Sequence, residues 1–347
     1  MKLLIHITLY VSALLLFSCN GETPVTDNPE QPEVVQPGDG ILGSTPALQA
    51  ITNKIKNDDQ NAQLYFERAE LLYEYDHYAF AIADLNKAIE LDPEPYEYYH
   101  LLADAYLDNL ESESALKIME SVVRRDTTRI ASMLKYSEFQ MILKQYDASM
   151  GTVSKILSLD RTNPDAFYLL GMNYKERGDT ARAINSFQNA VDEDPYYIDA
   201  YRNLANLLDN MGSPLAVQYF DNVLQIDSTD MDGLFGKGWF HHQRDNLEEA
   251  KIWYEKAAAL YPHNPDIHFN NGYLHMELKD IETALKKFDL SVKVEPTYAK
   301  GYYYRGLMAE MLGQTENAIN DFEQALALVP GYDKAREGLE RLGQNPN

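Results

Sequence analysis

Cysteine is almost absent from this 347-residue sequence, in which Cys19 is the single example. The chain therefore has no paired-cysteine site. Basic residues are also scarce, because 30 Lys and Arg stand against 54 Asp and Glu, which gives a formal net charge of −24. A chain with this charge is repelled by phosphate backbones, so we predict that it binds no nucleic acid.

The sequence also lacks the short motifs that mark common enzymes. It contains no nucleophile elbow, no glycine loop for phosphate and no His-Glu-x2-His motif. Five of the eight histidines cluster in repeated segments of the C-terminal half: His241, His242, His263, His268 and His275. His268 and His275 fall at positions that other segments fill with bulky packing residues, so we predict packing rather than metal binding. We predict no cofactor, although an enzyme that uses a pair of the many carboxylates stays an alternative.

Residues 164–197 contain the pattern that explains most of the chain. Apolar and small residues recur there at spacings of three or four, which predicts two helices that each bury one face. The first set is Phe167, Leu170, Gly171 and Tyr174, and the second is Ala183, Phe187 and Ala190. Gly178-Asp179 separates the sets, and Asp194-Pro195 ends the second helix because proline cannot continue a helix. The small residues mark where two helices can approach closely.

The same pattern recurs about every 34 residues. Counting in this register places the first residues of eight repeats at Ala62, Tyr96, Ile130, Pro164, Ile198, Met231, Pro265 and Ala299. The fifth repeat is one residue short, and Gly212-Ser213-Pro214 predicts a tighter turn there. A fixed period of this length predicts a helical array in which each repeat packs on its neighbours.

The order aromatic-x2-Leu-Gly-x2-Tyr, then Ala-x3-Phe-x2-Ala, then Pro resembles the tetratricopeptide repeat. The resemblance implies an all-α fold, namely a right-handed superhelical solenoid of about eight helix-turn-helix units over residues 62–332. Residues 46–61 are expected to form an N-terminal capping helix, because Ala47, Ile51 and Ile55 repeat the pattern of a second helix. Residues 333–347 are expected to form a C-terminal capping helix with a frayed tail.

The first 45 residues differ from the repeats. Residues 1–18 combine one lysine with an apolar run and a small residue, as in an export signal. Leu16-Phe17-Ser18-Cys19 resembles the lipobox of bacterial lipoproteins, which implies that Cys19 is lipidated and anchors the chain to a membrane. Asn20 implies sorting to the outer membrane, where the protein faces the periplasm or the cell surface. Residues 19–45 are rich in proline, glycine and acidic residues, which predicts a disordered tether.

In tetratricopeptide arrays the second, fifth, ninth and twelfth positions of each repeat usually line a concave groove. The resemblance implies an acidic entrance in the first two repeats, with Phe66, Glu70, His100 and Asp104. It implies a peptide-binding stretch in the later repeats, with Arg202, Asn206, Phe235, Trp239, His242, Phe269, Tyr273 and Tyr303. Arg202, Asn206 and Lys300 match only part of the clamp with which some family members hold a terminal carboxylate.

We therefore predict a non-enzymatic scaffold that recruits proteins or peptides of envelope assembly, secretion or cell-wall turnover. Two other interpretations of the groove stay open here. Its aromatic residues pack between neighbouring helices, or Trp239 and Tyr273 stack on a glycan or small molecule. Three triplets that begin with aspartate, at 126–128, 179–181 and 227–229, fit helix caps better than O-glycosylation sites.

Overall fold

The computed structural model describes residues 39–42 and 45–344, and all regular structure in them is helical. The helices are α1 (Asp39–Leu42), α2 (Pro46–Asn57), α3 (Ala62–Glu74), α4 (Tyr78–Leu91), α5 (Tyr96–Asp108), α6 (Ser112–Arg125), α7 (Ile130–Ile142), α8 (Tyr146–Leu159), α9 (Pro164–Glu176), α10 (Thr180–Glu193), α11 (Ile198–Asn210), α12 (Ala216–Ile226), α13 (Met231–His242), α14 (Leu247–Leu260), α15 (Pro265–Glu277), α16 (Ile281–Val294), α17 (Ala299–Met311), α18 (Thr315–Leu328) and α19 (Asp333–Arg341).

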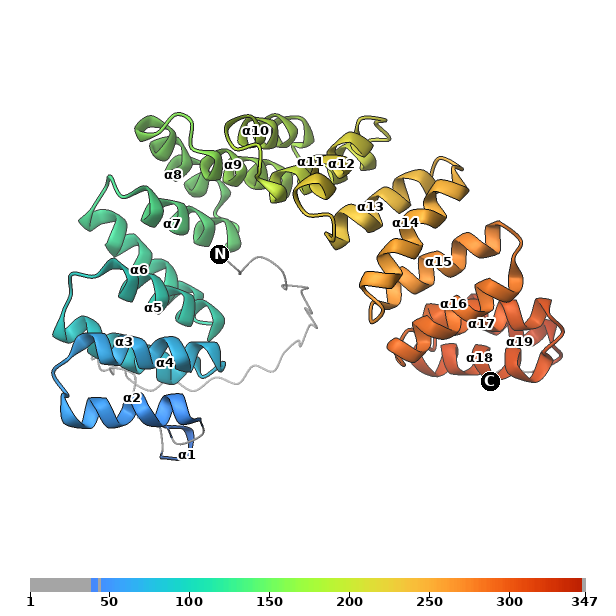
Figure 1. Cartoon of the computed structure of the whole chain (residues 1–347), viewed down its shortest axis with the longest axis horizontal. Helices are drawn as coiled ribbons and strands as arrows, with labels where there is room; N and C mark the ends of the chain where they lie inside the picture. Colours follow the sequence, from blue (N-terminus) through green and yellow to red (C-terminus); the bar gives the residue numbers. More distant parts are fainter. Residues whose placement is uncertain (1–38, 43–44, 345–347) are drawn as a thin grey trace, which may run out of the picture.

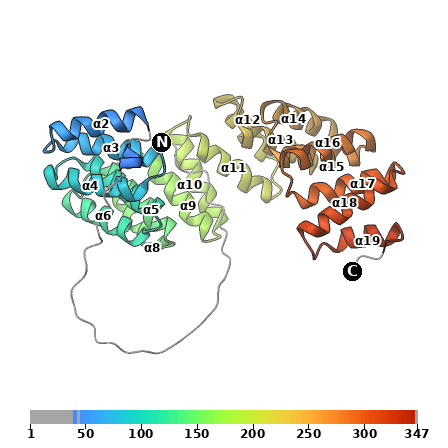
Figure 2. The same cartoon turned by 90° about the horizontal axis from the view of Figure 1, so that it is seen from below.

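Sixteen of these helices form eight successive pairs, from α3–α4 to α17–α18. The first helix of every pair begins at the residue where the sequence predicts a repeat to begin. Because α2 precedes the first pair and α19 follows the last, the predicted solenoid with a capping helix at each end is confirmed. Figure 1 shows the pairs along an open arc, with α7 and α9 on its inner side and α8 and α10 on its outer side. In Figure 2 the array runs from α2 to α19 with α11 near its middle.

Small residues and one buried apolar side chain of the second helix close each pair, as α9 and α10 illustrate. Ala183 and Phe187 of α10 are fully buried. A Cβ on Gly171 of α9 would lie 2.6 Å from the Phe187 ring, so any side chain there would collide with the ring. The predicted close approach of the two helices at these residues is thereby confirmed.

The turn inside each pair passes through one residue with a positive φ. Gly178 adopts a φ of 76° between α9 and α10, and Gly212 adopts 72° between α11 and α12. The structure corrects the predicted tighter turn at Gly212. Residues 211–215 separate α11 from α12, whereas residues 177–179 separate α9 from α10. The missing residue is taken from the first turn of α12, which has 11 residues where α10 has 14.

A buried ion pair inside the first helix pair also contacts the N-terminal cap. Arg68 of α3 donates from Nε and Nη2 to the two carboxylate oxygens of Asp84 of α4, over 2.6 and 2.7 Å. Its Nη1 donates to the Thr52 hydroxyl of α2 over 3.4 Å. Only 7% of the Arg68 side chain and 5% of the Asp84 side chain are exposed. Arg305 of α17 binds two carboxylates in a similar way at the other end of the array.

The predicted export signal, the predicted lipidation at Cys19 and most of the predicted tether lie outside the described residues. One part of the predicted tether forms α1, and Ile41 in it packs against the apolar cluster that contains Leu48 of α2. The end of the predicted tether therefore packs on the helical body through Ile41. In the described part of the chain, no helix combines the length and apolar character needed to cross a bilayer.

Candidate functional site

Figure 1 shows the first helices α7 and α9 on the inner side of the arc. The second, fifth, ninth and twelfth residues of the first helix in every pair make four rows, which we call the concave rows. Ten residues of the concave rows are Asp or Glu, and three are basic, namely Lys175, Arg202 and Lys300. The surface that follows the inside of the arc therefore carries an excess of negative charge.

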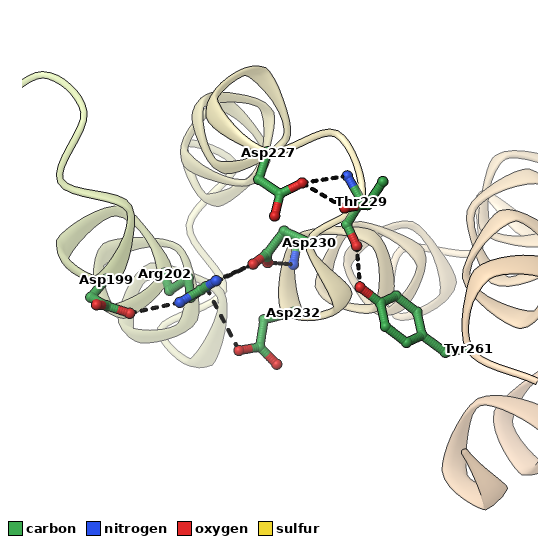
Figure 3. Close-up of polar contacts among 8 residues, drawn as sticks. Asp199, Arg202, Asp227, Thr229, Asp230, Asp232 and Tyr261 are labelled. Atoms are coloured by element: carbon green, nitrogen blue, oxygen red, sulfur yellow. Dashed lines mark hydrogen bonds and ion pairs between the residues drawn. The ribbon is translucent and has the colours of Figure 1, made fainter. Parts of the chain in front are cut away.

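Arg202 of α11 is surrounded by carboxylates between the fifth and sixth pairs (Figure 3). Its Nη1 donates to Asp199 over 2.6 Å, and its Nε and Nη2 both donate to Asp230, with an Nε distance of 3.0 Å. Asp232 lies 3.9 Å from Nε. Asp230 is buried, and its other oxygen accepts the N–H of Gly233 in the first turn of α13. Three carboxylates thus neutralise the one arginine of the concave rows and tie α11 to α13.

The turn beside this cluster is held by Asp227 (Figure 3). Its Oδ1 accepts the N–H and the hydroxyl of Thr229 over 2.9 and 2.7 Å, and Tyr261 donates its hydroxyl to the Thr229 carbonyl. Asp126 accepts the same two kinds of donor in its own turn, and Asp179 caps α10 through the N–H of its third residue. The predicted cap is confirmed at Asp179, whereas Asp126 and Asp227 hold turns and the helices that follow them begin with Arg129 and Asp230 as N-caps.

Phe235, Trp239 and His242 follow one face of α13. Phe235 is half-buried and packs on Tyr254 of α14, with ring centroids 5.7 Å apart. Trp239 is 40% exposed, and its ring meets His242 edge-on at 5.9 Å. His242 is 8% exposed, and its Nε2 lies 2.9 Å from Oε2 of Glu277 in α15. Trp239 is the large apolar side chain of this face that solvent reaches most readily.

The aromatic residues of α15 and α17 pack into one cluster. The Phe269 ring centroid lies 5.5 Å from that of Phe288 and 5.3 Å from that of Tyr304. The Tyr273 ring lies 5.6 Å from the same Tyr304 ring. Tyr303 is 9% exposed and belongs to the apolar core of the last pair. These rings mainly fill the space between neighbouring pairs.

The structure brings the predicted groove residues onto neighbouring first helices but exposes them unequally. Asn206 and Trp239 are exposed, Arg202, Phe235, Phe269 and Tyr273 are half-buried, and His242 and Tyr303 are buried. Their role in peptide binding stays a prediction. A partner that enters the concave side reaches Asn206 and Trp239 without any rearrangement of the helices.

The first three pairs carry carboxylates at the ninth position of the concave rows: Glu70, Asp104 and Glu138. Asp104 accepts a hydrogen bond from Lys135 Nζ over 2.6 Å. Burial raises the pKa of Glu70, and two neighbouring glutamates of α3 raise it further. Burial also raises the pKa of Glu138. The predicted acidic entrance of the first two pairs therefore continues into the third pair through Glu138, and Lys135 balances only part of this negative charge.

A pocket of about 420 Å³ adjoins this entrance between α2 and α3. It is lined by Ala47, Ala50, Ile51, Lys54, Glu67, Glu70, Leu71 and Glu74. The pocket thus joins apolar side chains of the N-terminal cap to the carboxylates of α3. Sequence reasoning missed it, because a capping helix is expected to cover a repeat rather than to line a groove.

The two histidines of α15 in the seventh pair serve as packing residues. His268 is buried, and its Nε2 lies 2.8 Å from the Pro262 carbonyl oxygen. His275 is also buried, and burial lowers its pKa. The predicted packing role of these two side chains is confirmed. Across the described residues, no three His, Cys, Asp or Glu side chains are grouped so that they could hold a metal ion.

Sequence reasoning also missed the partners that fix Arg202 and His242. Arg202 binds Asp230, which lies 28 residues further along the chain, and His242 contacts Glu277, 35 residues further along. Both separations are close to one repeat, because successive pairs pack side by side. A search for complementary side chains about one repeat apart would have found both contacts.

Helix pairs of this length and spacing, with small residues at their contacts and a cap at each end, define a tetratricopeptide-repeat solenoid. Three segments match sequence models of the tetratricopeptide repeat, namely residues 165–195, 232–264 and 299–332. They fall in the fourth, sixth and eighth predicted repeats. The chain thus contains tetratricopeptide repeats, as its sequence pattern predicts.

Known proteins with this fold resemble parts of the chain. A TPR repeat-containing protein of Methanocaldococcus jannaschii is 27% identical over 178 residues, which cover 48% of this chain and 31% of the relative. The chain therefore spans less than half of that relative's length. The C-terminal part of a TPR repeat-containing protein from Cytophaga hutchinsonii is similar in structure, with a TM-score of 0.56 and 20% identity over 69% of this chain and 99% of that one.

A second solved structure with a similar chain is the APC/C hetero-tetramer Cut9–Hcn1. The match covers 87% of this chain and 57% of that one. The TM-score is 0.52 and the identity is 17%. At this identity the similarity establishes the solenoid fold and leaves the partner to be inferred from the concave rows.

Proposed function

We propose that this chain is a non-enzymatic scaffold that recruits partner proteins through its concave rows while a lipid on Cys19 holds it at the bacterial envelope. The main support for this proposal is the exposed side chain of Trp239. Its side chain stays 40% exposed on the inner side of α13, while His242 beside it is buried. Other first helices place Glu70 or Asn206 at the same position, so the fold does not require a large aromatic residue there. Rigid aromatic side chains of this kind dominate the energetics of protein interfaces.

The form of the surface favours a protein or peptide as the partner. Stacked repeats create an extended concave surface that an extended or helical segment can follow across several pairs. The formal net charge of −24 disfavours nucleic acid. We assign the partners to envelope assembly, secretion or cell-wall turnover, because a lipid-anchored adaptor concentrates such proteins at the membrane.

Attachment to the membrane is supported by the sequence around Cys19. This single cysteine follows a segment with the features of an export signal. We propose the outer membrane as the site of attachment, with the repeats in the periplasm or on the cell surface. Cys19→Ala is expected to move the protein from the membrane fraction to the soluble fraction, and mass spectrometry of the N-terminal peptide identifies the lipid. Unchanged fractionation of Cys19→Ala would contradict the anchor and leave the scaffold proposal standing.

Affinity purification from detergent-solubilised envelope tests the scaffold itself, with the full chain, Trp239→Ala and Ile252→Ala compared. Ile252 lies on α14, the second helix of the same pair, and is 56% exposed, so its removal is a matched change away from the concave rows. We expect a defined set of proteins to bind the native chain and Ile252→Ala but not Trp239→Ala. Binding that survives Trp239→Ala, or that both substitutions abolish equally, contradicts the proposed surface.

Binding of a glycan or small molecule to the same tryptophan predicts a different result. In that case the fluorescence of the native chain responds to soluble envelope glycans, and the response disappears in Trp239→Ala. The other tryptophan, Trp253, is half-buried beside Lys237 and Lys256 and supplies the constant background. We expect no response to glycans.

A further inference from the structure

The three basic residues of the concave rows either have side-chain partners already or lie among many carboxylates. Arg202 is held by three carboxylates, and Lys175 donates its Nζ to Asn203 over 2.8 Å. Lys300 is exposed, but the concave rows also carry ten carboxylates. An anionic partner needs free cations, and these rows offer few. A chain-terminal carboxylate or an acidic segment is therefore disfavoured here.

Negative charge on the same rows is available. Five of the ten carboxylates form no ion pair with any residue that the structure describes: Glu70, Glu97, Glu138, Asp165 and Asp266. Burial raises the pKa of Glu70 and that of Glu138; neighbouring glutamates raise the pKa of Glu70 further, whereas the nearby Lys135 offsets part of the rise at Glu138. A cation placed beside these groups stabilises their ionised form.

We propose that the concave rows bind an extended cationic segment of a partner protein, with arginine or lysine side chains set against Glu70, Glu97 and Glu138. This inference rests on the proposed scaffold function and names the chemistry of the partner. The surface runs from the carboxylates of the first three pairs to the exposed Trp239 of the sixth. A segment that carries apolar residues among its basic ones therefore complements both parts of it.

The spacing of the helices fixes the spacing of the basic residues. Neighbouring packed helices lie about 8–10 Å apart, and a chain in the polyproline II conformation advances about 3.1 Å per residue with every third side chain on the same face. A basic residue at about every third position therefore meets successive first helices. The pocket between α2 and α3 suits the first of them, because its apolar lining contacts an aliphatic stem and its three glutamates outweigh the single Lys54 that also lines it.

Fluorescence anisotropy of labelled peptides with the full chain tests this pattern. The first peptide repeats Arg-Ser-Leu four times, the second repeats Glu-Ser-Leu four times, and the third has the composition of the first with all its arginines contiguous. All three are amidated at the C-terminus. We expect the first peptide to bind most tightly, with affinity falling about tenfold between low and high salt, and the second not to bind. Equal binding of the first and second peptides overturns the inference.

Two matched sets of substitutions locate the binding surface. Glu70→Gln, Glu97→Gln and Glu138→Gln together remove three carboxylates of the concave rows. Glu193→Gln, Glu255→Gln and Glu323→Gln remove the same charge from exposed positions on second helices. We expect the first set to weaken binding of the first peptide about tenfold or more and the second set by less than about twofold, with unchanged circular dichroism in both. Equal weakening by both sets contradicts binding at the concave rows.

The outcomes separate this inference from the scaffold proposal on which it rests. If envelope proteins are captured through Trp239 and the capture is unaffected by the three concave substitutions, the scaffold stands and the cationic segment is wrong. If the first peptide binds as expected but no envelope protein depends on Trp239, the charge preference stands and the scaffold proposal fails.

Discussion

Replacing Arg68 by methionine is expected to lower the free energy of unfolding by about 3–5 kcal/mol. Methionine keeps much of the apolar packing but leaves the Asp84 carboxylate, 5% exposed, without the two hydrogen bonds that satisfy it. A buried charge without a partner is costly because it has lost its hydration. In the double variant Arg68→Met with Asp84→Leu no charge is left unpaired. Its free energy of unfolding should therefore return to about the native value or exceed it.

Urea unfolding followed by circular dichroism measures these free energies for Arg68→Met and for the double variant. Hydrogen exchange should show the loss first in α2, α3 and α4, because a repeat interacts mainly with its neighbours. Arg124→Met is the matched control, since Arg124 is 78% exposed in its ion pair with Glu120. Exposed pairs contribute about 0–1 kcal/mol. If Arg68→Met costs no more than Arg124→Met, the reasoning about the buried pair is refuted.

Three further predictions concern other residues. Gly236→Ala is expected to cost about 1–3 kcal/mol in thermal unfolding, because a Cβ there would lie 2.2 Å from the Phe220 ring; an unchanged melting temperature argues against this contact. Leu110→Gly is expected to stabilise the chain by about 0.5–1 kcal/mol in urea, because Leu110 adopts a φ of 64° and is 91% exposed; a loss of stability contradicts this. Burial and the nearby Lys135 lower the pKa of His100 from 6.5 to about 4, so the unfolded chain binds this proton more tightly. The free energy of unfolding should therefore fall as the pH drops from about 6.5 to about 4, and it should fall less in His100→Gln. Urea midpoints at several pH values measure both chains, and identical pH profiles would contradict the role of His100.

The positions of the helices could be predicted from the sequence because every repeat carries the same physical pattern. Ala183 and its counterparts Ala81 and Ala250 occupy one column of the sequence and are all fully buried. Each column therefore reports the same helix contact several times. Ser149 of the third repeat replaces alanine in this column, and the pattern is still recognisable because the other repeats keep it. Ser149 is also fully buried.

The exposure of the groove residues could not be predicted in the same way, because it depends on contacts between successive pairs. Tyr303 packs against Tyr332, which precedes the C-terminal cap, and His242 is covered from the next pair by Glu277. The fifth repeat shows a similar limit. Counting residues reveals that one is missing, but the structure shows that α12 loses it while the turn at Gly212 keeps its usual conformation.

Photo-crosslinking in living cells tests most directly whether the concave rows recruit a protein. A photoreactive phenylalanine analogue placed at position 239 reports what touches the exposed position on α13, and the same analogue at position 252 reports the exposed position on α14. We predict a covalent adduct with a defined protein from position 239 and none from position 252. No adduct from position 239, or the same adducts from both positions, would contradict recruitment through the concave rows.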